Sequence, residues 1–163
     1  MPVRCSESQG GGDGRNLTGF YTPEPDALPG TVKGFAAMRR LIERLCDELV
    51  HTDVWLLTSH DRLVLMDSEE YDEGDWHVMI SAYDSCVSIT FKLPSEYSLF
   101  PDGDVVARAF NDEEAFSFSI VAMLNSSGWS EAPELKTKAE QAGAVQQATR
   151  SELDPLWRFE PES

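Results

Sequence analysis

The clearest pattern in the chain is a run of apolar residues at spacings of three and four over residues 31–50. Its members are Val32, Phe35, Met38, Leu41, Ile42, Leu45, Cys46 and Leu49. This period matches the 3.6-residue turn of a helix with one buried face. Thr31 is a suitable N-cap for it. The pattern therefore predicts a long amphipathic helix over this range.

From residue 54 the pattern changes to short apolar runs and alternation, which are typical of strands. Residues 54–58 and 62–66 flank a short polar segment and predict a hairpin. Residues 76–83 and 86–93 predict a second hairpin, and a fifth short strand is expected at 105–110. The fourth strand alternates most cleanly, with apolar Val87, Ile89, Phe91 and Leu93. Such alternation indicates an antiparallel sheet with one covered face.

Two helices are expected after the strands. Asn111 can cap the first, which runs to about residue 124 and ends before Gly128. Trp129 just beyond it is expected to pack back onto the body of the protein. The second, over 134–148, is weakly apolar.

The order of these elements predicts an α+β fold. It consists of an N-terminal helix, an antiparallel four- or five-stranded meander sheet, and then two C-terminal helices on one face. Residues 1–30 are rich in glycine and proline and predict a mostly irregular N-terminal arm, so residues 31–163 are expected to form a single domain.

Charge narrows the choice of partner. The 163 residues include 13 Lys and Arg against 29 Asp and Glu, a formal net charge of −16, and residues 51–133 alone carry −13. Nucleic acid and anionic membranes would be repelled, so we expect neither as a direct partner. The one basic cluster, Arg39, Arg40 and Arg44, is interleaved with acids, and the pairs Arg39–Glu43 and Arg44–Glu48 are spaced to form ion pairs. A cationic protein would be attracted. Solubility alone is the competing explanation of the charge.

The densest acidic stretch joins the two predicted hairpins. It lacks the glycine and glutamate positions of a calcium-binding loop. Aromatic residues among its carboxylates favour a protein contact. We predict that this loop binds a basic partner through Asp67, Glu69, Glu70, Tyr71, Asp72, Glu73, Asp75 and Trp76.

Motifs for catalysis are missing. His51, His60 and His77 lack zinc-site spacing, and there is no nucleophile elbow, phosphate loop or dinucleotide fingerprint. We therefore expect no catalytic residue, no metal and no cofactor. A small hydrolase or transferase is the alternative of another class, for which Cys86 beside His77 on a neighbouring strand is one arrangement.

Cellular location follows from two further observations. Three widely spaced cysteines predict no disulfide framework, and no stretch approaches the ~20 apolar residues that span a bilayer. The N-terminus lacks the apolar segment of a secretory signal. We expect a cytoplasmic protein.

The profile of size, charge and element order resembles bacterial toxin-immunity proteins. The segments that carry the resemblance are the acidic loop at 67–75 and the helix end at 122–129. It implies a small protein without enzymatic activity that neutralises a cationic toxin or effector. Acidic secretion chaperones are similar in size and charge, and a DNA-mimic inhibitor is a further alternative. The oligomeric state stays open.

Overall fold

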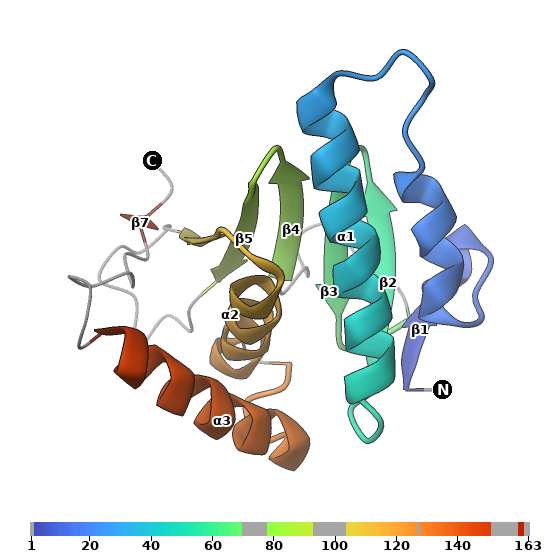
Figure 1. Cartoon of the computed structure of the whole chain (residues 1–163). Coiled ribbons are helices and arrows are strands. Elements are labelled where there is room, and N and C mark those ends of the chain that lie inside the picture. Colours follow the sequence, from blue (N-terminus) through green and yellow to red (C-terminus); the bar gives the residue numbers. More distant parts are fainter. Residues whose placement is uncertain (1, 70–77, 93–103, 127, 151–159, 162–163) are drawn as a thin grey trace.

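The structure is a computed structural model that describes residues 2–69, 78–92, 104–126, 128–150 and 160–161. Over these residues the chain is α+β, as predicted. A mixed sheet forms one layer, and helices α1 (Pro29–Glu48) and α2 (Asp112–Asn125) pack on one of its faces (Figure 1). Helix α3 (Pro133–Arg150) packs against α2.

The described strands form one sheet in the order of the chain. β1 (Val3–Cys5) is parallel to β2 (Val54–Ser59). The next strands follow as an antiparallel meander: β3 (Arg62–Met66), β4 (Val78–Tyr83), β5 (Cys86–Lys92) and β6 (Asp104–Ala109). β7 (Glu160–Pro161) is antiparallel to β6. His60 and Asp61 form the predicted turn between β2 and β3.

The predicted sheet was therefore wrong in two details. The five-stranded meander from β2 to β6 is present, but β1 extends it in parallel and β7 extends it at the other edge. A strand of three residues and one of two residues are too short to show an alternating pattern in the sequence.

The three α-helices lie near their predicted positions. α1 spans Pro29–Glu48, so it begins before Thr31, and Leu28 is its N-cap. Proline suits this first position because its fixed φ is helical and its missing N–H is not needed there. α2 spans Asp112–Asn125, and the side chain of Asn111 accepts a 2.8 Å hydrogen bond from the backbone N–H of Glu114, as expected of the cap. α3 spans Pro133–Arg150.

The main core lies between the helices and the sheet. α1 contributes Met38, Ile42 and Leu45, which the 3.6-residue period places on one side of the helix. Alternate strand residues meet them, including the paired Ile80 and Ile89. This apolar contact packs α1 against the sheet.

The first thirty residues contain regular structure. After β1 come two 3-10 helices, η1 (Glu7–Gln9) and η2 (Gly14–Tyr21). The side-chain amide of Gln9 donates to the carbonyl oxygen of Thr58 at 2.8 Å and accepts from its backbone N–H at 2.7 Å. The backbone N–H of Cys5 donates to the carbonyl of Gly12 at 2.8 Å. Whether a domain boundary lies at residue 30 stays a prediction.

Tyr21, at the end of η2, is a buried residue whose substitution is expected not to lower the stability of the protein. Its side chain is fully buried, packed edge-on against Phe35, and its hydroxyl has no hydrogen-bond partner among the described residues. A buried unpaired hydroxyl costs about 1–3 kcal/mol. We expect Tyr21→Phe to leave the free energy of unfolding unchanged or raise it, as measured by urea denaturation. Tyr83→Phe, at an exposed hydroxyl, is the control. A clear loss of stability in Tyr21→Phe alone would contradict the prediction.

Candidate functional site

The predicted acidic loop is described only at its start. Asp67 and Glu69 are exposed, whereas Glu70, Tyr71, Asp72, Glu73, Asp75 and Trp76 lie outside the described residues. The side chain of Asp67 lies against Gly128, where an added Cβ would come within 3.0 Å of it. The start of the loop therefore meets the α2–α3 connection. The partner-binding role of these eight residues stays a prediction.

Trp129 in that connection packs back onto the body, as predicted. Its side chain is only 5% exposed, and its indole N–H donates to the carbonyl oxygen of Asp53 at 3.0 Å. Asp53 directly precedes β2. The bond therefore ties the α2–α3 connection to the start of that strand.

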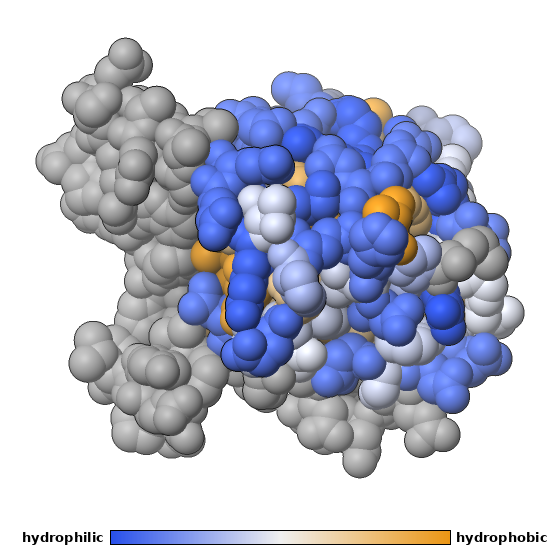
Figure 2. All heavy atoms as spheres, turned by 90° about the horizontal axis from the view of Figure 1, so that it is seen from below, coloured by the Kyte–Doolittle hydropathy of each residue, from blue (hydrophilic) through white to orange (hydrophobic). Residues whose placement is uncertain are grey.

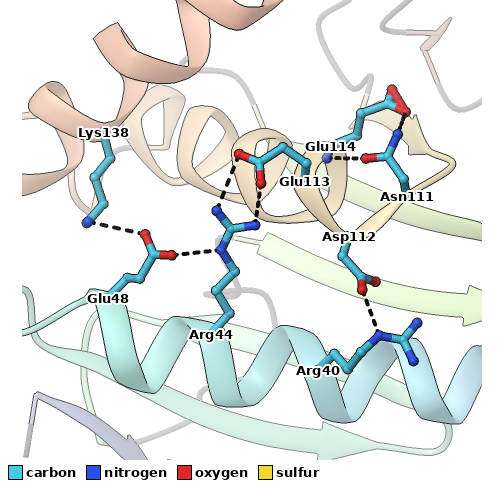
Figure 3. Close-up of polar contacts among 8 residues, drawn as sticks. All are labelled: Arg40, Arg44, Glu48, Asn111, Asp112, Glu113, Glu114 and Lys138. Atoms are coloured by element: carbon cyan, nitrogen blue, oxygen red, sulfur yellow. Dashed lines mark hydrogen bonds and ion pairs between the residues drawn. The ribbon is translucent and has the colours of Figure 1, made fainter.

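An ion network joins the three α-helices (Figure 3). The guanidinium of Arg44 on α1 donates to both carboxylate oxygens of Glu113 on α2, at 2.8 and 3.3 Å, and to Glu48 at 2.8 Å. Glu48 also meets Lys138 of α3 at 3.4 Å. The guanidinium of Arg44 lies 4.2 Å from the centroid of the Phe116 ring. Hydrogen bonding from Arg44 lowers the pKa of Glu113, against a smaller opposing effect of burial.

Each arginine of α1 thus has a partner within the chain. Arg40 donates to Asp112 at 2.7 Å. Arg39 does not pair with Glu43 as predicted; its guanidinium donates to the backbone carbonyl of Tyr21. The difference arises from tertiary packing, because η2 lies against α1 and brings the carbonyl oxygen of Tyr21 within reach of Arg39.

Carboxylates exceed cations over the rest of the described surface. At least seven of the ten basic side chains described are in ion pairs within the chain: Arg4, Arg15, Lys33, Arg40, Arg44, Lys136 and Lys138. By contrast, Glu24, Asp26, Glu43 and Asp61 form no ion pair with a described basic residue, and all four are exposed. The surplus negative charge is therefore available to a partner.

A groove of about 280 Å³ lies between α1, the β4–β5 turn and the start of α2. We call it the α1–α2 groove. Four apolar side chains from three elements or connections line it: Ala36 and Ala37 of α1, Val87 of β5, and Phe110 just before α2. Phe110 is 59% exposed, so much of its aromatic ring faces solvent. Tyr83, in the last position of β4, is likewise 60% exposed.

Two ion pairs also line the α1–α2 groove. Lys33 lies 3.4 Å from Asp84, and Arg40 lies 2.7 Å from Asp112. All four side chains are more than half exposed. Ion pairs this exposed contribute little to stability and exchange readily with solvent. The groove therefore combines apolar walls with carboxylates whose present partners are weakly held.

Next to the groove, α1 approaches the sheet closely at two glycines. A Cβ added at Gly34 would lie 2.4 Å from the carbonyl oxygen of Ala82, and one at Gly30 would lie 2.5 Å from the Tyr83 ring. The backbone N–H of Asp84 donates to the carbonyl of Gly30 at 2.8 Å. Asp84 has φ 55, a left-handed conformation that aspartate tolerates in turns. The β4–β5 turn is thus held directly against the first turns of α1.

The opposite end of the molecule is different in character. Seen from below, the described surface is largely hydrophilic, with small and separate hydrophobic patches (Figure 2). Glu134 near this end accepts hydrogen bonds from the backbone N–H groups of Val50 and His51 and from the hydroxyl of Thr52, at 2.7–3.0 Å. Burial favours a raised pKa for Glu134, but these donors together lower it. These hydrogen bonds from residues 50–52 to Glu134 tie the segment that follows α1 to α3.

Other chemistry at the described residues is limited. They contain no group of three or more His, Cys, Asp or Glu side chains placed to hold a metal ion. Burial raises the pKa of the Cys46 thiol to about 11, and it also raises that of Cys5, which disfavours the reactive thiolate in both. His77, and with it the suggested pairing with Cys86, lies outside the described residues.

Comparisons with other proteins give no assignment. No protein-family model, no curated protein and no solved structure matches the chain. Among the helices described, none has the length and apolar character needed to cross a membrane.

Sequence reasoning missed the α1–α2 groove. Two signals were present: the Gly30–Gly34 spacing on one helix, which permits a close approach, and an aromatic residue, Phe110, directly before a helix cap.

Proposed function

We propose that this chain is a binding protein without enzymatic activity that neutralises a cationic protein in the cytoplasm, in the manner of an immunity protein directed at a bacterial toxin. The observation that carries the proposal is the imbalance of its surface. Internal ion pairs engage most of the described cations, while exposed carboxylates such as Glu24, Asp26 and Asp61 lack a basic partner. Such a surface attracts a positively charged protein and speeds its approach.

The engaged arginines of α1 support a protein rather than a nucleic acid as partner. Phosphate binding needs basic side chains that are free to neutralise phosphates and so release the counterions condensed on the nucleic acid. Arg44 is held by both carboxylate oxygens of Glu113 on α2, and Arg39 by a carbonyl oxygen. Exposed Tyr83 and Phe110 add the aromatic anchors typical of protein interfaces.

The test is binding to a basic protein at two salt concentrations. The first candidate is the product of the gene next to its own, purified and titrated calorimetrically in about 50 mM and about 500 mM NaCl. We expect a complex whose Kd rises at least about tenfold at high salt, because salt screens the attraction between surface charges. Protection of cells that express the partner is the matching functional readout.

Three other outcomes would overturn the proposal. A complex that does not respond to salt would remove the electrostatic basis. Binding only to the N-terminal segment of a secreted effector, by a dimer, would indicate a secretion chaperone. Turnover of a small substrate by the purified chain would indicate a hydrolase or transferase.

A further inference from the structure

We infer that the α1–α2 groove receives a long basic side chain, arginine or lysine, from the cationic partner; this inference rests on the proposed function. The first argument is the amphipathic character of the groove. Its walls are apolar, from Ala36, Ala37 and Phe110, and Asp84 and Asp112 also line it. Lysine and arginine side chains have the same division, with an apolar stem and a charged end.

Size supports the same occupant. The volume of about 280 Å³ falls just below the roughly 300–1,000 Å³ typical of small-molecule sites. A single extended side chain fits a groove of this size better than a drug-sized ligand does. The Phe110 ring, which is 59% exposed, is available to contact the stem or to stack on a guanidinium.

The ion pairs lining the groove give the mechanism. Lys33 and Arg40 at present neutralise Asp84 and Asp112, and each pair is more than half exposed. A cation from the partner that enters the groove gains the same carboxylates in a less hydrated setting, where charge pairs are stronger. It must displace the internal cation to do so. Removal of Lys33 therefore frees Asp84 and should strengthen binding rather than weaken it.

The experiment uses the full chain and, as probe, a blocked hexa-arginine peptide, with hexa-lysine as the second arm. Amide chemical shifts in NMR titrations locate the site and give the Kd. We expect the largest shifts at Ala36, Ala37, Val87 and Phe110. Phe110→Ser should weaken binding about tenfold, in line with the loss of an aromatic anchor. Phe110 is exposed, so the variant is expected to fold, which circular dichroism checks.

Charge variants are compared with matched controls. Asp84→Asn with Asp112→Asn should weaken binding about tenfold more than Glu24→Gln with Asp26→Asn, which removes the same charge outside the groove. Lys33→Ala should tighten binding about threefold more than Lys136→Ala, which removes a cation from an exposed pair on α3.

The outcomes separate the two proposals. Equal losses from both pairs of acidic variants, or shifts confined to other surfaces, would overturn the groove inference and leave the proposed function standing. Absence of any peptide binding, or no difference between Lys33→Ala and Lys136→Ala, would overturn the groove inference as well. The proposed function is tested separately, by the salt titration with the protein partner and by the other outcomes given for it above.

Discussion

Gly34→Ala is expected to lower the free energy of unfolding by about 3 kcal/mol, although alanine is intrinsically the better helix former. Gly34 is buried on α1, and an added Cβ would lie 2.4 Å from the carbonyl oxygen of Ala82 and 2.8 Å from its carbon. These are backbone atoms of β4, so they cannot rotate away. Either α1 or the strand must move, and the packed core between them opposes both. Urea denaturation followed by circular dichroism measures the loss.

Gly30→Ala is the matched control, four residues earlier on the same helix. There the added Cβ would meet the Tyr83 ring at 2.5 Å, but that side chain is exposed and free to turn outward. We expect little change in stability for Gly30→Ala. If Gly34→Ala proved as stable as the wild type, the close approach of α1 to β4 would be incorrect, and with it the position of the α1–α2 groove.

Trp129→Ala is expected to cost about 3–5 kcal/mol, the usual range for removing a buried tryptophan. Trp129 is 5% exposed and belongs to the main core, and its indole N–H bonds to the carbonyl of Asp53. The substitution leaves a cavity beneath the α2–α3 connection and an unpaired carbonyl at the start of β2. The measurement is the midpoint and slope of urea unfolding.

Trp129→Phe separates burial from hydrogen bonding. Phenylalanine retains most of the apolar surface and loses the bond to Asp53, so we expect a loss of about 1–2 kcal/mol. A cost for Trp129→Ala below that of Trp129→Phe would show that the side chain is not part of the core.

The sequence predicted the elements whose signals are local and repeated. The apolar spacing of α1 and the alternation of β5 each span several residues with one partner layer, so the helix, the meander and the cap at Asn111 were found. β1 was missed because its three residues become a strand only when β2 lies alongside. Pro29 falls within the range predicted to be irregular, although it occupies the first position of α1.

The candidate site was less accessible to sequence reasoning. The α1–α2 groove depends on residues more than seventy positions apart, such as Arg40 and Asp112, and no short motif records that pairing. The spacing of four predicted Arg44–Glu48 correctly, but it could not show that Arg44 also binds Glu113 or that Arg39 turns to Tyr21. Local spacing identifies neighbours on one helix, whereas the contacts of Arg44 with Glu113 and of Arg39 with Tyr21 join different elements.

The side chain of Gln9 has a consequence for how this protein can meet other chains. Its side-chain amide hydrogen-bonds the backbone N–H and C=O of Thr58 on β2, beyond the end of β1. On the outer side of β1, the carbonyl of Gly12 accepts a hydrogen bond from the backbone N–H of Cys5. An open strand edge invites another chain to add a strand, in specific recognition or in aggregation. At this edge the protein has used those backbone groups itself. A partner that binds here must therefore recognise side chains, and growth of the sheet from one copy to the next is blocked on this side.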